Sequence, residues 1–323
     1  IVDNPTGYGR IIKENDTFKA IVEQKDCDSE QAKVREINSG IYWFRAEKLS
    51  GLLDKLGNNN AAGEYYLTDT VAVAEKKGVY TADSTDVVLG ANSRSQLAAL
   101  NEVARKRKLA ELMDEGVDIP LSDGIIIGKG VKIGHDTVIL PNTIIKGKTV
   151  IGNGCEIGPN SYIVDCVIED NVILNNVQAH ESKVDSCAKA GPFVHLRPNT
   201  HLHSGVKIGD FVEVKNSEIG LNTCIAHLTY IGDSDVGKGV NFGCGCVTAN
   251  YDGIKKYRTT IGDNAFIGCN TNMIAPVTIG DNATTAAGST ITKNVPADSL
   301  AVERGQTRII EHWEKNSKRI KKA

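Results

Sequence analysis

The sequence has 323 residues, of which 41% are hydrophobic and 24% charged, which is ordinary for a globular protein of one or two domains. Its net charge of −3 lacks the basic excess that nucleic-acid binding usually needs. Eight cysteines are too sparse for a disulfide scaffold, and no apolar run is long enough to cross a membrane. We therefore expect a cytoplasmic protein with neither nucleic-acid nor membrane partners.

Residues 1–94 contain no repeat and mix two kinds of pattern. Segments 11–24 and 37–44 are strand-like, whereas stretches near 46–56 and 68–77 are helix-like. This part is therefore predicted to be a mixed α/β domain.

Residues 95–115 are predicted to form a linking helix. They contain no Gly or Pro, and Ser93 or Ser95 can cap the first turn. Apolar residues recur near helical spacing at Leu97, Leu100, Val103, Leu109 and Leu112. The basic run at 105–108 is interpreted as a solvated helix face, because the chain as a whole is acidic.

The remainder of the chain carries a six-residue repeat. Isoleucine recurs at this period at Ile127, Ile133, Ile139, Ile145, Ile151, Ile157 and Ile163. Four residues after each of the first six stands a small side chain, at Val131, Thr137, Thr143, Thr149, Cys155 and Ser161. The period returns at Ile219, Ile225, Ile231, Ile261, Ile267, Met273, Ile279 and Ile291, with Thr285 at a weakened step. It slips between 164 and 218, and an excursion interrupts it from 243 to 260.

A period of six fits a short strand followed by a corner better than it fits a helix or simple strand alternation. The pattern resembles the hexapeptide-repeat family. This resemblance implies a left-handed parallel β-helix with triangular coils over residues 116–323, in which stacked coils bury a ladder of isoleucines.

Polar residues gather between 195 and 258, where the repeat does not require them. His227 lies two positions beyond the inward Ile225, at a corner where its ring can face outward and act as a base. A surface or packing histidine is the plainer interpretation of the same position.

Five motifs in this region, HLRP, VEVK, AHLTYIGD, NFGCG and ANYDG, stand in the order found in one family. The chain resembles the bifunctional bacterial enzymes that join an N-terminal uridylyltransferase to a C-terminal glucosamine-1-phosphate acetyltransferase and make UDP-N-acetylglucosamine. The resemblance implies that His227 is the general base for acetyl transfer from acetyl-CoA. It assigns the sugar phosphate to Arg197, Lys215, Tyr230 and Asn241.

The resemblance assigns acetyl-CoA to Cys244, Asn250, Tyr251, Cys269, Ala287 and Arg304. Cys244 and Cys269 depart from the Ala and Ser usual in the family, and a covalent cysteine is a minor alternative that we set aside. A backbone N–H in the turn from Gly243 to Gly245 is expected to hold the thioester oxyanion. Enzymes with hexapeptide repeats generally work as trimers, so we expect a homotrimer with sites between neighbouring subunits.

Residues 1–94 resemble the C-terminal part of the uridylyltransferase domain. Gly9, Glu23, Asn38 and Asn92 match its sugar-nucleotide contacts, and Asn92 would also ligate Mg²⁺. The Gly-rich phosphate loop and the metal-binding aspartate of the family do not occur in this sequence. We therefore expect a partial nucleotidyltransferase domain that does not transfer uridylyl groups.

Three other interpretations compete with this one. Zinc bound by His195, His201 and His203 would indicate a hexapeptide carbonic anhydrase, although solvent-facing histidines explain them more simply. The β-helix could instead only assemble or regulate a sugar-nucleotide transferase. A non-enzymatic scaffold or exchange subunit would have the same two-part layout.

Overall fold

The computed structural model describes residues 1–91 and 93–311, and these form two compact units that divide in sequence between Glu102 and Val103. None of the helices in the described residues combines the length and the hydrophobicity that a membrane span requires.

The N-terminal unit is built on an antiparallel hairpin of β1 (Arg10–Glu14) and β2 (Thr17–Val22). Asn15 and Asp16 join the strands with φ angles of 47° and 60°, as a two-residue hairpin turn requires. The small core beside the hairpin consists of Ile11, Phe18 and Ile21, packed against Tyr42 and Val71. The helices of this part are η1 (Gln24–Asp26), η2 (Gln31–Lys33), α1 (Ala46–Leu53), α2 (Thr68–Val73) and η3 (Thr85–Val88).

The prediction of a strand at 37–44 is wrong. Ile37 forms an isolated bridge with Arg10, and the chain then leaves the hairpin. Ile41 and Trp43 are 67% and 97% exposed and Tyr42 packs against the hairpin core, but beyond Ile37 the segment forms no β-bridge within the described residues.

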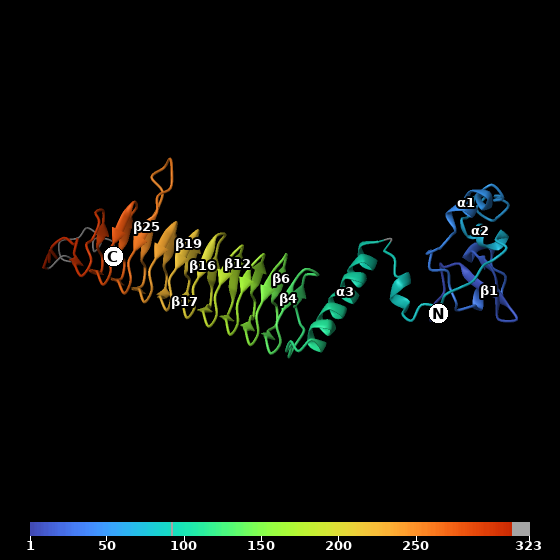
Figure 1. The fold of residues 1–323 in the computed structure, drawn as a ribbon, viewed down its shortest axis with the longest axis horizontal. Coiled ribbons are helices and arrows are strands. Elements are labelled where there is room, and N and C mark those ends of the chain that lie inside the picture. Colours follow the sequence, from blue (N-terminus) through green and yellow to red (C-terminus); the bar gives the residue numbers. More distant parts are fainter. Residues whose placement is uncertain (92, 312–323) are drawn as a thin grey trace, which may run out of the picture. The chain divides into compact units, whose positions relative to one another are not determined.

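Helix α3 (Arg94–Asp114) begins and ends one residue earlier than the range expected from the sequence. The Ser93 hydroxyl accepts a hydrogen bond of 3.2 Å from the Gln96 amide, which is an N-cap contact. Leu109 and Leu112 are 2% and 1% exposed and belong to the core of the β-helix. The last turns of α3 therefore close the first end of that core (Figure 1).

The second unit is a parallel β-helix with three faces, each named here by its first strand (Figure 1). The β3 face consists of β3 (Ile126–Ile127), β6 (Ile144–Lys146), β9 (Tyr162–Val164), β12 (Val177–His180), β15 (Val194–Leu196), β18 (Glu213–Lys215), β21 (Tyr230–Gly232), β24 (Val247–Ala249), β27 (Asn272–Ile274) and β30 (Thr290–Ile291). The β4 face consists of β4 (Lys132–Ile133), β7 (Val150–Ile151), β10 (Val167–Ile168), β13 (Lys183–Val184), β16 (Thr200–Leu202), β19 (Ser217–Ile219), β22 (Ser234–Val236), β25 (Thr259–Ile261) and β28 (Val277–Ile279). The β5 face consists of β5 (Val138–Ile139), β8 (Glu156–Ile157), β11 (Ile173–Leu174), β14 (Lys189–Ala190), β17 (Lys207–Asp210), β20 (Cys224–His227), β23 (Asn241–Phe242), β26 (Phe266–Ile267), β29 (Thr284–Thr285) and β31 (Leu300–Ala301).

The predicted isoleucine ladder is the core of this unit. Each residue that the six-residue period singled out is buried, including Ile145 at 0% exposure and Thr285 at 1%. The small residues four positions later are buried as well. The ladder is continuous because every strand aligns with the strand one coil away, as Ile127 aligns with Ile145 and Ile145 with Ile163.

The slips in the repeat are single-residue deletions at corners. The inward residue after Ile163 is Ile168, five positions on, and the tight corner between them contains Asp165 with φ 53°. The same shortening separates Val214 from Ile219, with Asn216 at φ 46°. Asn and Asp tolerate this left-handed conformation, so each deletion changes a corner and leaves the ladder intact.

The predicted excursion from 243 to 260 is too long. β24 (Val247–Ala249) still belongs to the β3 face, and Phe242 and Thr248 occupy inward positions of the kind that isoleucine fills in other coils. The chain leaves the coil only after Asn250, forms a loop with a bridge between Tyr251 and Lys256, and returns at β25. We call residues 251–258 the projecting loop, which stands out from the β-helix in Figure 1.

Candidate functional site

His227 stands on the edge between two faces of the β-helix. It is the last residue of β20 on the β5 face, and Tyr230 begins β21 on the β3 face three residues later. The side chain of His227 is exposed, and Leu228 turns the corner with φ 45°. The ring thus faces outward, so it is free of the packed core and can reach a bound molecule.

Three of the residues assigned to the sugar phosphate lie on the outer surface of the β3 face. Arg197 directly follows β15, Lys215 ends β18, and Tyr230 begins β21, so they come from three successive coils. Because alternate residues of a strand point to opposite faces, these side chains point outward while Leu196, Val214 and Ile231 fill the core.

Gly232 makes room for Tyr230. A Cβ atom at Gly232 would lie 2.4 Å from the Tyr230 hydroxyl and 2.7 Å from Nδ2 of Asn250. Since Lys215 aligns with Gly232, the phenol hydroxyl lies over the backbone of the coil next to Lys215. The absence of a side chain at position 232 therefore keeps this hydroxyl beside the cationic residues.

The charges of this group leave it able to bind an anion. Arg197 donates to Glu213 Oε1 at 2.7 Å, and this carboxylate raises the pKa of Arg197. Interaction with the Lys256 ammonium group lowers the pKa of Lys215, and burial and the charge of Arg197 act in the same direction. Basic residues that repel one another in this way are stabilised when a phosphate binds between them.

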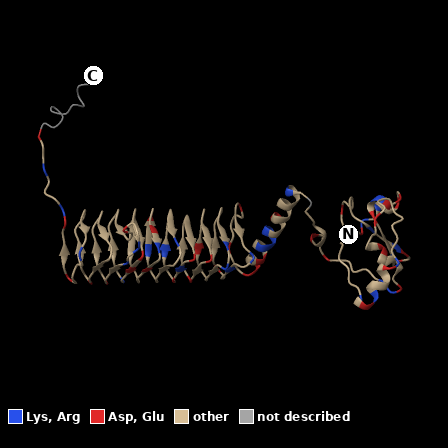
Figure 2. Ribbon diagram, turned by 90° about the horizontal axis from the view of Figure 1, so that it is seen from above, with Lys and Arg blue, Asp and Glu red and all other residues tan. Residues whose placement is uncertain are grey.

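Lys256 was not among the residues predicted to bind substrate. It belongs to the projecting loop, which reaches Lys215 because both of its ends are held to the coils. Arg258 donates to Asp235 Oδ2 at 2.8 Å and to the Ser234 carbonyl at 3.0 Å. The KKYR run indicated a basic cluster, but only the path of the loop brings Lys256 to Lys215. Figure 2 shows in blue where Lys and Arg residues lie along the β-helix.

Most of the residues assigned to acetyl-CoA lie along the edge that carries His227. Backbone hydrogen bonds connect the coils along this edge. The Gly245 N–H contacts the His227 carbonyl at 3.5 Å, the Asn270 N–H donates to the Cys244 carbonyl at 2.8 Å, and the Gly288 N–H donates to the Cys269 carbonyl at 2.7 Å. His227, Cys244, Cys269 and Ala287 therefore occupy equivalent places in four successive coils, spaced by about 4.8 Å. Arg304 continues the row, since its Cδ lies 4.0 Å from the Cβ position of Gly288.

The turn expected to hold an oxyanion has two of its three amides engaged. Gly243 donates to the Ile267 carbonyl at 2.7 Å, and Gly245 makes the long contact with His227 already described. The Cys244 N–H is therefore the candidate donor of this turn.

Two of the assigned acetyl-CoA residues and one sugar-phosphate residue lie elsewhere in the single chain. Asn241 is exposed on the β5 face, in β23. Asn250 lies at the far edge of the β3 face, 7% exposed, and its amide donates to Asp233. Tyr251 is 60% exposed in the projecting loop, and its hydroxyl donates to the Gly253 carbonyl at 2.7 Å.

The residues assigned to the sugar nucleotide meet at the start of the N-terminal unit. Asn38 N–H donates to the Gly9 carbonyl at 2.8 Å, and a Cβ atom at Gly9 would lie 3.2 Å from Glu23 Oε1. Asn38 Nδ2 also donates to the Tyr42 hydroxyl at 2.6 Å, and burial raises the pKa of Tyr42. Asn38 and Tyr42 line a cavity of about 590 Å³ with mainly apolar walls. Asn92 lies outside the described residues, so the predicted Mg²⁺ ligand has no described geometry.

The three histidines of the zinc alternative do not converge. His195 lies on the β3 face in β15, with its ring centroid 6.2 Å from that of His180. His201 and His203 lie on the β4 face, beside Asp185. The arrangement expected of a carbonic anhydrase is therefore not formed within the described part of the chain.

Comparison with known proteins places this architecture in a family. The family model described as bacterial transferase hexapeptide (six repeats) matches residues 130–165 and 258–293, in agreement with the predicted left-handed β-helix. The bifunctional protein GlmU of Clostridium acetobutylicum is 48% identical over 317 residues, covering 97% of this chain and 70% of its own length. That of Acetivibrio thermocellus is 49% identical over 318 residues, with coverages of 97% and 69%.

Similarity to solved structures is weaker. A UDP-N-acetylglucosamine acyltransferase from Francisella novicida is 16% identical, with a TM-score of 0.32, over 55% of this chain and 64% of its own. The assignment to a family therefore rests on the relatives that are similar in sequence. The chain belongs to the family of bifunctional GlmU proteins.

Proposed function

We propose that the β-helix transfers the acetyl group of acetyl-CoA to the amine of glucosamine-1-phosphate. Membership of the GlmU family supports a transferase of this kind. The observation that carries the proposal is the position of His227, which is exposed, begins the row of Cys244, Cys269 and Ala287, and borders the cationic side of the β3 face.

The chemistry needs one base and one oxyanion donor. The amine of the sugar attacks the thioester carbonyl, and His227 takes a proton from that amine as the C–N bond forms. The Cys244 N–H holds the developing oxyanion. The C–S bond then breaks, and the proton passes to the departing thiolate of coenzyme A.

The phosphate of the sugar binds to the basic group. It carries between about −1.5 and −2 charges at neutral pH, and Arg197 and Lys215 offer charge-assisted hydrogen bonds. Tyr230 donates from its hydroxyl. We add Lys256 to this set, because a bound phosphate offsets the repulsion that lowers the pKa of Lys215.

Acetyl-CoA lies along the edge of the β-helix beyond His227. Cys244, Cys269 and Ala287 form its narrow floor, and Arg304 supplies a cation for the coenzyme phosphates. Asn241, Asn250 and Tyr251 are separated from this row in one chain. We therefore propose that a neighbouring subunit of a homotrimer supplies these contacts, so that each site is completed between two copies.

The N-terminal unit belongs, in this proposal, to the uridylyltransferase half of the enzyme. Gly9, Glu23 and Asn38 meet in one place, which supports a shared sugar-nucleotide contact. Magnesium binding and the loss of uridylyl transfer in this 323-residue chain stay predictions.

Release of free CoA in the presence of glucosamine-1-phosphate tests the proposal. We expect His227→Ala to lower kcat by about 100- to 10,000-fold, as loss of a general base does, while acetyl-CoA binding persists. His135→Ala is the matched control, because His135 is also exposed on the β-helix but lies in an early coil. An unchanged rate for His227→Ala would favour a β-helix that only assembles or regulates, and preference for glucosamine-6-phosphate would contradict the substrate.

A further inference from the structure

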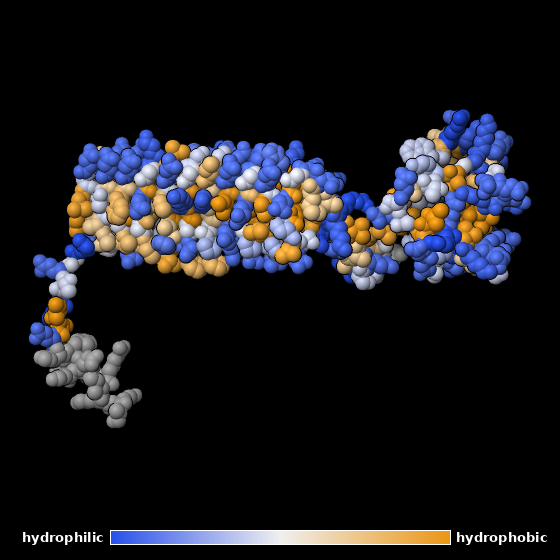
Figure 3. Space-filling view, turned by 90° about the horizontal axis from the view of Figure 1, so that it is seen from below, coloured by the Kyte–Doolittle hydropathy of each residue, from blue (hydrophilic) through white to orange (hydrophobic). Residues whose placement is uncertain are grey.

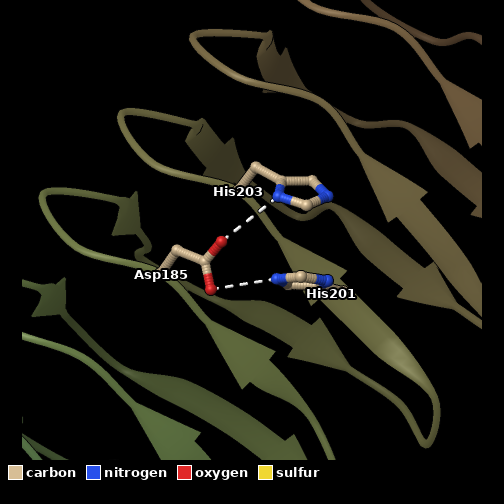
Figure 4. Close-up of side chains that lie close together, drawn as sticks. All are labelled: Asp185, His201 and His203. Carbon is tan, nitrogen blue, oxygen red and sulfur yellow. Dashed lines mark hydrogen bonds and ion pairs between the residues drawn. The ribbon is translucent and has the colours of Figure 1, made fainter.

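A compact group of nitrogen and oxygen donors lies on the β4 face. His201 lies in β16, His203 follows that strand, and Asp185 follows β13 one coil earlier. The two imidazole rings lie side by side with centroids 3.9 Å apart, and Asp185 faces both of them (Figure 4). One ligand atom from each of the three residues lies within 4.8 Å of the other two. We propose that Asp185, His201 and His203 bind a zinc ion.

The position of each ring nitrogen supports a metal rather than hydrogen bonds alone. Toward Asp185, the contacts are His201 Nε2 to Oδ1 at 2.9 Å and His203 Nδ1 to Oδ2 at 3.2 Å. On the opposite side, Glu218 Oε2 lies 2.9 Å from His201 Nδ1 and 3.1 Å from His203 Nε2. All four ring nitrogens thus face carboxylate oxygens.

Two neutral imidazoles carry only two N–H groups, so they cannot satisfy four such contacts. If both N–H groups point to Glu218, the lone pairs of His201 Nε2 and His203 Nδ1 point toward Asp185. A divalent cation on that side accepts these lone pairs and neutralises the Asp185 carboxylate. Glu218 then serves as the outer carboxylate that orients metal-bound histidines.

The spacing is close to what zinc needs. Zn–N and Zn–O bonds of about 2.0–2.2 Å in a tetrahedron place neighbouring ligand atoms about 3.3–3.5 Å apart. The His203 Nδ1–Asp185 Oδ2 contact of 3.2 Å is near this value, and one ligand atom from each of the three residues lies within 4.8 Å of the other two. The Asp185, His201 and His203 side chains are 13%, 20% and 39% exposed, so the site is partly shielded yet open to an entering ion.

The donor types select the metal. Imidazole nitrogens favour zinc and similar transition metals over Mg²⁺ and Ca²⁺, which prefer oxygen ligands only. Lys183 contacts Asp185 Oδ1 at 2.8 Å and leaves Oδ2 for the metal.

Zinc at this position would connect neighbouring coils through their side chains. Asp185 belongs to one coil and the histidines to the next, while Glu218 aligns with His201 from the coil beyond. Metal binding to the folded state adds to its stability according to concentration and affinity. The site lies on the β4 face, so it is separate from the proposed acetyl-transfer residues on the other two faces.

Calorimetric titration of the EDTA-stripped 323-residue protein with zinc chloride tests the site. We expect the wild type to bind one more Zn²⁺ per chain than the double variant His201→Gln/His203→Gln, with affinity at this site falling by at least about 100-fold in the variant. Zinc should also raise the thermal midpoint of the wild type more than that of the variant. His135→Gln is the matched control, since within the described residues His135 pairs with one carboxylate, that of Asp136, at 2.7 Å.

Equal zinc stoichiometry and affinity in the wild type and the double variant would overturn the proposal, as would an equal loss in His135→Gln. Circular dichroism establishes that each variant is folded. If the double variant is not, Asp185→Asn serves in its place, because it removes a charged ligand at nearly constant size. Cobalt(II) gives an independent readout, since nitrogen and oxygen ligands produce its visible bands without the charge-transfer band of a thiolate.

Discussion

Gly232 has no side chain, and this allows the Tyr230 hydroxyl to lie beside the cationic residues of the proposed site. A methyl group there would push the Tyr230 hydroxyl aside, because the two atoms would be 2.4 Å apart. The hydroxyl is the end of a side chain that can move, so the fold should tolerate Gly232→Ala. The substitution should instead weaken binding of the sugar phosphate, because the displaced Tyr230 hydroxyl can no longer donate to it.

We therefore predict that Gly232→Ala raises KM for glucosamine-1-phosphate about tenfold, the value of one hydrogen bond. The change in KM for acetyl-CoA should be smaller but not absent, because the added Cβ atom would also lie 2.7 Å from Nδ2 of Asn250. Steady-state kinetics with each substrate varied in turn measures this. Gly78→Ala is the control, since a Cβ atom at Gly78 would meet nothing within 4 Å. Equal effects on both KM values would show that position 232 acts on the fold rather than on the sugar.

At this scale the sequence allowed part of the site to be predicted. Arg197, Lys215 and Tyr230 could be named from motifs, and the regular coil does bring them together. Lys256 could not, because its place depends on the path of the projecting loop. Asp185 was missed for a similar reason, since a one-residue deletion at a corner sets which coil residue faces His203.

At the scale of strands and coils, the inward ladder carries the stability of the β-helix. Ile145 is fully buried between Ile127 and Ile163. We predict that Ile145→Asp destabilises the unit by about 4 kcal/mol or more, because a carboxylate there has neither water nor a partner. Thermal unfolding followed by circular dichroism measures the change.

Ile126→Asp is the control for that substitution. Ile126 precedes Ile127 on the same face but points outward and is 45% exposed, so its replacement should shift the thermal midpoint far less. Similar losses in the two variants would contradict a ladder that acts through burial.

The periodic strands were predictable from sequence because two side chains in each repeat of six are buried, the ladder residue and the small residue four positions later. Irregular segments were not. Residues 37–44 have a strand-like sequence, yet beyond the isolated bridge between Ile37 and Arg10 they pair with no strand within the described residues. The projecting loop was predicted too long, because Phe242 and Thr248 take inward places without matching the expected residue types.

At the scale of the whole molecule, an apolar ridge beside His227 supports assembly with other copies of the chain. Phe193 and Phe211 stack with ring centroids 5.2 Å apart and planes 6° from parallel, and Leu228 occupies the next coil. All three side chains are more than half exposed. Figure 3 shows apolar residues along one flank of the β-helix, bordered by hydrophilic ones.

We predict that sedimentation at assay concentration gives a mass near three times 34.7 kDa. Dilution to monomer should abolish acetyl transfer, because Asn241 and Asn250 lie away from His227 within one chain. A monomer that retains full activity would contradict a site shared between subunits.

The closing of the core by Leu109 and Leu112 has a consequence for solubility. A stack of parallel coils ends in unpaired peptide groups that match the exposed end of any identical stack. Because α3 blocks one end, two molecules cannot dock head to tail and extend into a filament through that end. Helix α3 thus prevents end-to-end stacking of β-helices at this end, where further coils could otherwise be added.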